Sequence, residues 1–320
     1  MNVLITGGCG FLGSNMVKKL LNDDTNIYIV DNLSTGSLEN VEHLLSDNVK
    51  FFKYDITDEK IKDYINEWQI DEIYNFACPA SPKYYLDYPI ETWNASILGV
   101  KNLLESIKGT NRKLFHSSTS EVYGDALVMP QVEEYWGNVN PIGVRACYDE
   151  GKRAAETLIY DYIRKFDVDA RVVRIFNTYG PGMSVYDGRV ISNFVTQALT
   201  GKDITIYGDG NQTRSFCFVD DTIDAIYRLM KLDTKLDTPV NIGNPQERTI
   251  NEVAEYVKEV LKSDSKIVHL EKMSDDPQKR RPNINKAKEN LNWSPVVTYE
   301  EGMKKTILYF AEKVEKWEFQ

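Results

Sequence analysis

Two residues with complementary acid–base chemistry, Tyr148 and Lys152, lie four positions apart in the segment RACYDEGKRAAETL. The segment has the composition of a helix, and residues four apart in a helix share one face, one turn from each other. A free tyrosine has a pKa of about 10, and a nearby ammonium group lowers that pKa by favouring the ionised phenol. The spacing therefore fits a phenol that accepts a proton near neutral pH. It also fits an amphipathic surface helix with a partly buried tyrosine, so other residues must decide between the two.

A second group of residues indicates what a proton acceptor would serve. Gly7, Gly10 and Gly13 occur at G-x-x-G-x-x-G spacing directly after an apolar run and at the start of a helical pattern, with Phe11 and Leu12 between the last two. Glycine allows a tight turn and a close approach of the backbone to a pyrophosphate, which a helix N-terminus then attracts. The spacing differs by one residue from the usual dinucleotide fingerprint. A glycine-rich turn without a ligand is the alternative.

Acidic residues at the ends of the next two predicted strands support a dinucleotide site. Asp31 ends the second strand, where a carboxylate accepts a hydrogen bond from the adenosine ribose, and Asn32 follows it without a nearby cation for a 2′-phosphate. Asp55 and Ile56 end the third strand, where they would border the adenine. These residues predict NAD, in preference to NADP, as the cofactor.

A bound nicotinamide gives the tyrosine and lysine a chemical task. Removing a hydride from an alcohol carbon requires removal of the hydroxyl proton as well, and a tyrosinate can take it. Lys152 would favour that tyrosinate and also hold the nicotinamide ribose. Thr119, at the end of the fifth predicted strand, would orient the substrate oxygen.

The elements that must position these residues alternate regularly up to about residue 178. Such alternation of strands and helices predicts βαβ units and a parallel sheet. Beyond residue 180 short strands and helices mix, and ITIYGDG and PVNIGN are two of these strands. The fold class is therefore α/β: a Rossmann-type doubly wound parallel sheet over residues 1–178, followed by a smaller C-terminal α/β substrate-binding lobe over residues 179–320. Apolar strands are predicted within 2–7, 26–32, 49–56, 71–77, 113–119 and 170–180, and helices within 11–23, 89–109 and 148–165.

Composition excludes several other classes. The 320 residues carry a net charge of −10, which disfavours a nucleic-acid partner. Four widely spaced cysteines and three scattered histidines form no zinc or disulfide pattern, so we expect no metal and reduced thiols in a cytoplasmic protein. The N-terminus lacks the pattern of a signal peptide and no run is long enough to span a bilayer, so no membrane partner is expected.

The order of these motifs resembles a known family. The glycine segment, STSEVYG, Tyr-x-x-x-Lys and RIFNTYGPG are similar to the extended short-chain dehydrogenase/reductase family that acts on nucleotide sugars. The segments CPASPKYY, PIGVRACYDEGKRAAE, DGRVISNF, YGDGNQTRSF and DDPQKRRPNI resemble, more narrowly, the UDP-glucuronic acid decarboxylases, or UDP-xylose synthases. The resemblance implies NAD-dependent oxidation at C4 of UDP-glucuronic acid, loss of CO₂ from the resulting β-keto acid, and re-reduction to UDP-xylose.

The resemblance also implies roles for individual residues. Thr119 and Tyr148 would serve oxidation with Lys152, Ser120 and Glu121 would lie beside C5 and C6, and Arg280 would engage the carboxylate or the departing CO₂. The remaining implied substrate contacts are Tyr85 with the sugar acid and Asn177, Arg189, Tyr207, Gln212 and Arg214 with the UDP portion. The two arginines suit a diphosphate.

Other activities of the same family remain open as alternatives. A nucleotide-sugar 4-epimerase or 4,6-dehydratase uses the same oxidation, and a catalytically silent NAD-binding regulator would share the fold. Dehydratases have an aspartate where this chain has Ser120, and Arg280 also disfavours both enzymes. Relatives pair the helices predicted at 89–109 and 148–165 across a four-helix bundle, so the resemblance implies a homodimer.

Overall fold

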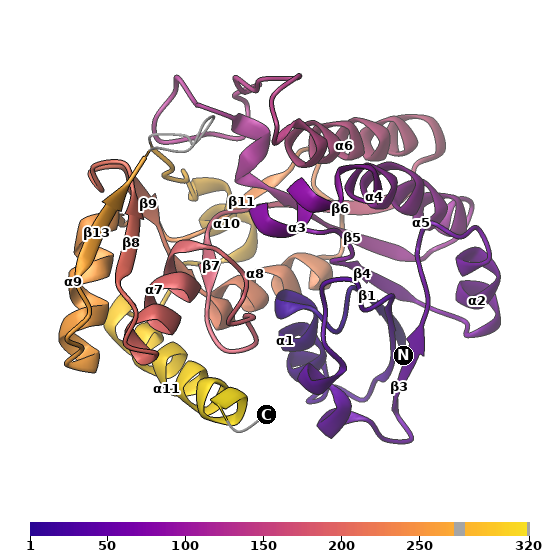
Figure 1. Ribbon diagram of the computed structural model, residues 1–320. Coiled ribbons are helices and arrows are strands. Elements are labelled where there is room, and N and C mark those ends of the chain that lie inside the picture. The colour runs from indigo at the N-terminus through magenta and orange to yellow at the C-terminus, as the bar shows by residue number, and fades with distance from the viewer. Residues whose placement is uncertain (272–278, 319–320) are drawn as a thin grey trace.

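A seven-stranded parallel sheet forms the centre of the molecule (Figure 1). The structure is a computed structural model that describes residues 1–271 and 279–318. The chain begins inside the sheet, fills one side of it, and then crosses over to fill the other, which is the doubly wound topology predicted. The order across the sheet is β3 (Val49–Lys53), β2 (Asn26–Asp31), β1 (Asn2–Thr6), β4 (Glu72–Asn75), β5 (Lys113–Thr119), β6 (Asp169–Ile175) and β11 (Val240–Ile242).

Helices cover both faces of this sheet because its strands are apolar on both sides. In β1, Val3 and Ile5 enter one core and Leu4 enters the other, as the two-residue period of a strand requires. The core around Leu4 is closed by α2 (Ile61–Glu67), α5 (Val100–Ile107) and α6 (Ala146–Phe166). The opposite core is closed by α1 (Phe11–Leu20) and α8 (Val219–Lys231), which pack against each other.

The helix predicted over residues 89–109 is present with one widened turn. It consists of α4 (Pro89–Asn94), the π-helical turn η3 (Ala95–Gly99) and α5, and it follows the short helix α3 (Pro82–Asp87). A Cβ added at Gly151 of α6 would lie 3.1 Å from the hydroxyl oxygen of Ser96 in η3. The widened turn therefore lies where the two helices approach most closely, and the glycine permits that approach.

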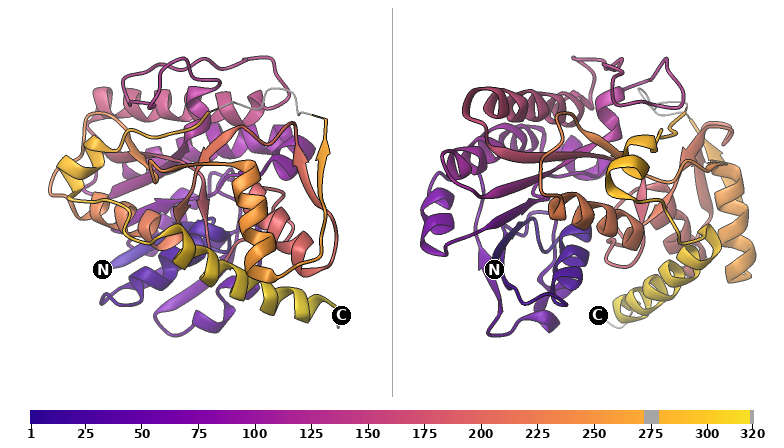
Figure 2. Two further views of the ribbon diagram at one scale, coloured as in Figure 1. Left: turned by 90° about the vertical axis from the view of Figure 1, so that its left-hand side faces the viewer. Right: turned by 180° about the vertical axis from the view of Figure 1, so that it is seen from behind.

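A second group of elements packs beside the sheet, and its buried apolar side chains are continuous with the core that α1 and α8 close. The right-hand view of Figure 2 shows α9 (Ile250–Leu261) and α11 (Tyr299–Glu318) on the opposite side of the molecule from α2. The predicted strand ITIYGDG is present as β8 (Ile204–Tyr207), paired with β13 (Ile267–Leu270). The other elements of this group are the strand pairs β7 (Thr178–Tyr179) with β10 (Cys217–Phe218) and β9 (Thr213–Ser215) with β12 (Glu247–Thr249), and the helices α7 (Val190–Leu199) and α10 (Asn285–Leu291).

One predicted strand belongs to a different part of the fold from the one expected. The segment PVNIGN contains β11, which pairs in parallel with β6 and extends the main sheet. The reason is that α8 carries the chain back across the sheet face before β11, as a crossover helix does between parallel strands. The boundary expected after residue 178 remains a prediction.

The C-terminal helix offers a matched test of the core of the second group. Phe310 is fully buried, whereas Leu308 on the same helix is 58% exposed. Phe310→Ala should lower the free energy of unfolding by about 3–5 kcal/mol, because it removes a buried ring and leaves a cavity. Leu308→Ala should change it by about 0.5 kcal/mol or less. Urea titration followed by circular dichroism measures both, and equal effects would contradict the placement of Phe310 in the core.

Candidate functional site

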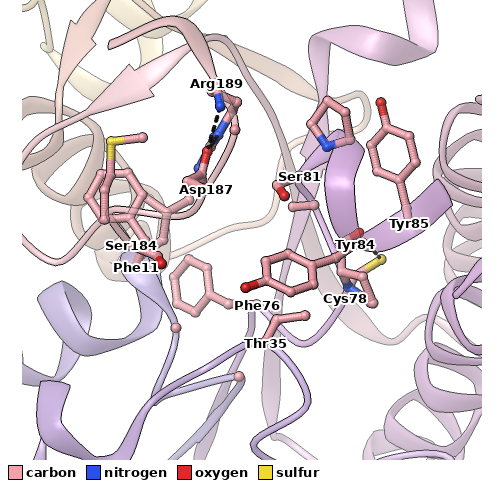
Figure 3. Close-up of a pocket in the computed structure, with 18 of the residues that line it drawn as sticks. Phe11, Thr35, Phe76, Cys78, Ser81, Tyr84, Tyr85, Ser184, Asp187 and Arg189 are labelled. Atoms are coloured by element: carbon pink, nitrogen blue, oxygen red, sulfur yellow. Dashed lines mark hydrogen bonds and ion pairs between the residues drawn. The ribbon is translucent and has the colours of Figure 1, made fainter. Parts of the chain in front are cut away.

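A large cavity lies where the carboxyl ends of the parallel strands face the second group of elements. It has a volume of about 1620 Å³. Figure 3 shows Phe11, Asp187 and Arg189 on one side of it and Ser81, Tyr84 and Tyr85 on the other. All the site residues predicted from the sequence line this one cavity: Gly7, Gly10, Phe11, Leu12, Gly13, Asp31, Asn32, Asp55, Ile56, Tyr85, Thr119, Ser120, Glu121, Tyr148, Lys152, Asn177, Arg189, Tyr207, Gln212, Arg214 and Arg280.

The glycine segment forms a tight loop between β1 and α1. Gly7 has a φ of +69°, and its N–H donates to the carbonyl of Val30 at 2.8 Å. A Cβ added at Gly13 would lie 2.2 Å from the Gly7 carbonyl oxygen, so α1 can approach the loop this closely only with glycine there. Helix geometry leaves the first N–H groups of α1 without acceptors inside the helix, and they begin at Phe11. The loop thus presents donors and positive potential to the cavity, which fits a pyrophosphate.

The acidic residues after β2 and β3 are held by local hydrogen bonds. The Asp31 carboxylate accepts from the N–H groups of Cys9 at 3.0 Å and Leu33 at 2.8 Å. Burial is the main reason that the pKa of Asp31 is raised. A carboxylate has about four acceptor positions, so two backbone bonds leave room for the ribose hydroxyls expected here. These bonds fix the carboxylate at the edge of the cavity.

Asp55 is linked to the same part of the cavity. It accepts from Thr57 and from the Asn32 side-chain amide at 2.8 Å, and these bonds outweigh the effect of burial, so its pKa is lowered. An ionised Asp55 thereby orients the Asn32 amide, while Ile56 is buried beside it. Together with the glycine loop, this arrangement fits the adenosine and pyrophosphate of a dinucleotide.

The predicted Tyr148 and Lys152 pair is present, but its electrostatics differ from the expectation. Tyr148 is 6% exposed, and the Lys152 ammonium lies 5.9 Å from the centre of its ring. Lys152 donates to the backbone carbonyl of Ser117 at 2.7 Å. Burial raises the pKa of Tyr148 above that of a free tyrosine, and a hydrogen bond with Thr119 only partly opposes it. The sequence-based expectation combined Lys152 with the positive charge of a bound nicotinamide to lower this pKa, and the protein groups by themselves leave it raised.

Stacking with Tyr85 fixes the ring of Tyr148. The two ring centres are 5.1 Å apart and the planes differ by 7°. Tyr85 comes from α3 and is buried, and its hydroxyl has no hydrogen-bond partner among the described residues. A buried hydroxyl without a partner is costly, so this group is suited to a polar ligand atom in the cavity.

An ion cluster occupies the cavity wall beyond Thr119. Glu121 follows Thr119 in the short helical turn η4 (Ser120–Tyr123), where Ser120 is also buried. The Arg280 guanidinium binds both carboxylate oxygens of Glu121, and its Nη2 donates to Oε2 at 2.6 Å. Part of the predicted segment DDPQKRRPNI, residues 275–278, lies outside the described residues, whereas Arg280 is described and 6% exposed.

Two members of this cluster, Arg145 and Asp149, were not predicted from the sequence. Arg145 Nη2 donates to Glu121 Oε2 at 2.6 Å, and Arg145 Nε lies 4.0 Å from Asp149 Oδ2. Spacing contained a signal for the first, since Arg145 caps the N-terminus of α6 three residues before Tyr148. The charge partner on η4 was not visible in the sequence, because the fold brings it there.

The residues assigned to the UDP portion come from the second group of elements, except Asn177, which lies between β6 and β7. Arg189 is paired with Asp187, whose Oδ2 accepts from Nη2 at 2.8 Å, so its guanidinium is already held in place (Figure 3). Arg214 is buried and donates from Nη1 to the Thr213 carbonyl. Gln212 donates to the Tyr207 carbonyl at 2.8 Å, and the Asn177 carbonyl accepts from the N–H of Cys217. Both arginines, Arg189 and Arg214, therefore line the cavity.

A metal site and a membrane-spanning helix are both missing from the described part of the chain. Within residues 1–271 and 279–318, no set of three or more His, Cys, Asp or Glu side chains is arranged to hold a metal ion. Over the same ranges, no helix combines the length and apolar character that crossing a membrane requires.

The strand order, the glycine loop and the Thr119, Tyr148 and Lys152 set define a dinucleotide-dependent short-chain dehydrogenase/reductase of the extended type. Residues 4–306 match the family model described as GDP-mannose 4,6 dehydratase. The UDP-glucuronic acid decarboxylase 1 of Xenopus tropicalis is 48% identical over 98% of this chain and 73% of its own length. The UDP-glucuronic acid decarboxylase 6 of Arabidopsis thaliana is 47% identical over 95% of this chain and 87% of its own length. The chain belongs to the GDP-mannose 4,6 dehydratase family, in the group of the UDP-glucuronic acid decarboxylases.

Solved structures of other members confirm the fold. The UDP-glucose 4-epimerase of Thermotoga maritima, determined with UDP-glucose, is 30% identical with a TM-score of 0.90, covering 98% of this chain and all of that one. The dTDP-glucose 4,6-dehydratase of Bacillus anthracis, determined with NAD, is 30% identical with a TM-score of 0.87, covering 99% of this chain and 98% of that one.

The glycine loop provides a graded test of its packing. Gly13→Ala places a Cβ 2.2 Å from a backbone oxygen, whereas the Cβ of Gly10→Ala would meet the same oxygen at 3.2 Å. Without cofactor, Gly13→Ala should lower the free energy of unfolding by about 1–3 kcal/mol through overpacking, and Gly10→Ala should cost less. Thermal or urea unfolding measures both. A Gly13→Ala protein as stable as the parent would contradict the close approach of α1 to this loop.

Proposed function

We propose that this protein catalyses the NAD-dependent decarboxylation of UDP-glucuronic acid to UDP-xylose through a UDP-4-keto intermediate. The observation that carries the proposal is the position of Arg280 and Glu121 in the same cavity as Thr119, Tyr148 and Lys152. An oxidation set alone suits many sugars, but a buried guanidinium beside it suits a substrate that bears a carboxylate. The near 50% identity to proteins named UDP-glucuronic acid decarboxylase supports this choice.

The cofactor assignment to NAD rests on the fit of the glycine loop, Asp31, Asn32 and Asp55, and on the NAD in the similar dehydratase structure. When bound, NAD supplies the hydride acceptor at C4, returns the hydride later, and adds a positive charge near Tyr148. That added charge favours the phenolate, which burial in the protein alone disfavours. Lys152 is placed to hold the nicotinamide ribose, and Phe11, Leu12 and Gly13 to face the pyrophosphate.

The proton chemistry is assigned to the residues around the phenol. Tyr148 accepts the C4 hydroxyl proton, and the Thr119 hydroxyl, which is hydrogen-bonded to Tyr148, orients the sugar oxygen. Tyr85 is stacked on Tyr148 and offers its unpartnered hydroxyl to the sugar acid. The C4 ketone then stabilises the enolate that remains when C6 leaves as CO₂. Arg280 holds the carboxylate, and Ser120 and Glu121 border C5 and C6.

The second group of elements is assigned to the nucleotide. Arg189 and Arg214 would bind the diphosphate, since guanidinium groups match phosphate oxygens in charge and geometry. Asn177, Tyr207 and Gln212 line the same wall and would contact the rest of the UDP portion. On this proposal, residues 179–320 carry the nucleotide-sugar lobe and residues 1–178 the NAD-binding domain.

The four free thiols suit a reducing, cytoplasmic compartment.

A nucleotide-sugar 4-epimerase or 4,6-dehydratase is the second candidate, because solved structures with those names share the fold. Ser120 occupies the position where a dehydratase needs an acid for the C6 hydroxyl, so dehydration is disfavoured. The Arg280–Glu121 pair beside the sugar pocket favours the decarboxylase over both.

We also propose a homodimer through α4, η3, α5 and α6. Large apolar side chains are exposed on α4 and η3, including Ile90 at 64% and Leu98 at 47%. Burial of such side chains against a second copy would stabilise a two-fold helical interface.

The activity is tested by incubating the protein with UDP-glucuronic acid and NAD⁺ while CO₂ release and product mass are followed. We expect UDP-xylose and one CO₂ per substrate. Tyr148→Phe should lower kcat roughly 10²- to 10⁴-fold, because it removes the proton acceptor without altering the stacking ring. Formation of UDP-galacturonic acid, or of a product that has lost water, would instead support the second candidate.

A second variant separates oxidation from decarboxylation. Arg280→Ala should still reduce NAD⁺ in the presence of UDP-glucuronic acid but release CO₂ slowly, because the carboxylate loses its partner. Absorbance of NADH and trapped CO₂ report the two steps. If both rates matched the parent's, the role given to Arg280 would be wrong.

The dimer is tested by light scattering during size-exclusion chromatography. The parent should have the mass of two chains, and Leu98→Arg should shift the protein toward one chain because it places a charge in the apolar interface. Leu308→Arg, at an exposed leucine of α11, is the matched control and should leave the mass unchanged. A parent protein with the mass of one chain would contradict the proposal.

A further inference from the structure

The four charged residues Glu121, Arg145, Asp149 and Arg280 form one cluster, which we call the carboxylate cluster. Its members come from η4, from α6 and from the segment before α10, and the fold alone brings them together. Two guanidinium groups and two carboxyl groups sum to zero charge when both carboxyl groups are ionised. Glu121 and Arg280 are 8% and 6% exposed. Uncompensated charge in such a place is strongly unfavourable.

A substrate carboxylate would disturb this balance. On the proposed function, the C6 carboxylate of the sugar binds beside Arg280, so three carboxyl groups would then face two guanidinium groups. The cluster can return to zero charge if one carboxyl group takes up a proton. The buried Nε of Arg280 has no hydrogen-bond partner among the described residues, so this arginine still has a donor to offer the incoming carboxylate.

The two protein carboxyl groups are not equivalent in this respect. Glu121 receives hydrogen bonds from both arginines, which stabilise its ionised form. Asp149 is 9% exposed, its Oδ2 is 4.0 Å from Arg145 Nε, and its Oδ1 has no hydrogen-bond partner among the described residues. It also lies outside the set of described residues that line the cavity. Asp149 is thus the less stabilised anion and the natural place for a proton.

We propose that Asp149 takes up one proton when the substrate carboxylate binds beside Arg280, and so keeps the buried carboxylate cluster neutral. It acts as a positioning residue through Arg145, which continues to hold Glu121 when Arg280 is shared with the substrate. This inference rests on the proposed function, because it needs a ligand with a carboxylate.

The electrostatic surroundings of Asp149 agree with this assignment. Burial, followed by the charge of Glu121, raises the pKa of Asp149 to about 7, against the opposing effects of Arg145 and Arg280. A third carboxylate raises that pKa further. At pH 8 the free protein therefore has mostly ionised Asp149 and gains a proton on binding, whereas at pH 6 Asp149 is already protonated. The titratable and charged groups that face Asp149 are Arg145, Cys147, Tyr148 and Glu150 of α6, Tyr85 of α3, Glu121 of η4, and Arg280.

The charge balance can be followed through the reaction. Decarboxylation converts R–COO⁻ and H⁺ into R–H and CO₂: the C5–C6 bond breaks, its electron pair passes into the enolate, and a proton from solvent then bonds to C5. The negative charge therefore moves from the carboxylate to the enolate when neutral CO₂ leaves, and it disappears only when C5 is protonated. Asp149 then releases to solvent the proton that it gained on binding, so the one proton consumed overall is the one that bonds to C5.

The test is isothermal titration calorimetry on the NAD⁺-loaded Tyr148→Phe protein, in which turnover is slowed enough for binding to be measured. Titrations at pH 8 in buffers of different ionisation enthalpy give the number of protons taken up. We expect the binding of UDP-glucuronic acid to be accompanied by uptake of close to one more proton than the binding of UDP-xylose. UDP-xylose has the same nucleotide but no carboxylate. The difference should approach zero at pH 6. If the number of protons taken up on binding were equal for the two ligands at pH 8, this result alone would overturn the proposal, and no variant at Asp149 would be needed.

A variant then assigns the proton to its residue. Adding Asp149→Asn should abolish the extra proton at pH 8, since asparagine is already neutral, and the affinity for UDP-glucuronic acid should no longer fall with rising pH. In the Tyr148→Phe protein that affinity should fall up to about tenfold per pH unit above 7, as uptake of one proton requires. Glu150→Gln, one residue along and paired with Arg153 instead, is the matched control and should keep the extra proton. If the extra proton were still taken up in the Asp149→Asn protein, Asp149 would be excluded as the group that binds it.

The outcomes also distinguish this inference from the proposed function. If UDP-glucuronic acid neither binds nor is converted, the proposed function fails, and this inference fails with it. If it is converted to UDP-xylose but binds with the same proton number as UDP-xylose, only the inference about Asp149 fails.

Discussion

The ion pair between Arg280 and Glu121 is the interaction on which the arrangement of the site depends. It joins the end of β5, through η4, to a segment of the chain that lies far away in the sequence, and both side chains are buried. Because each ion needs its partner in such surroundings, the pair ties the segment that carries Arg280 to the strand end that carries Thr119.

Burial has two opposite consequences in this cavity. It raises the pKa of Tyr148, so the protein groups alone keep the phenol neutral. The same low polarity strengthens the effect of any positive charge that a bound cofactor adds. On the proposed function, the phenol would depend on the cofactor's charge to ionise, because the packing between α6 and α3 buries it. The direct hydrogen bond of the Lys152 ammonium is to the Ser117 carbonyl, whereas the centre of the Tyr148 ring is 5.9 Å away.

Much of the fold followed from local patterns. Apolar strands, a glycine loop and helical periodicity predicted the parallel sheet, and the order of motifs along the chain identified the residues that line the cavity. The parts that were missed involve contacts between distant segments. β11 joins the main sheet because α8 returns the chain to it, and a short apolar run has no feature that specifies which strand it pairs with.

The sequence by itself determined which chemical groups are available and which of them share a strand end or a helix face, because spacing of four residues or fewer fixes neighbours in a helix. It thereby set Tyr148 beside Lys152 and placed the glycines around the start of α1. Only the tertiary structure decided the charges those groups carry. The neutral phenol of Tyr148, the paired carboxylate of Glu121 and the raised pKa of Asp149 depend on burial and on arginines from other segments, and the degree of burial is a property of the packed protein.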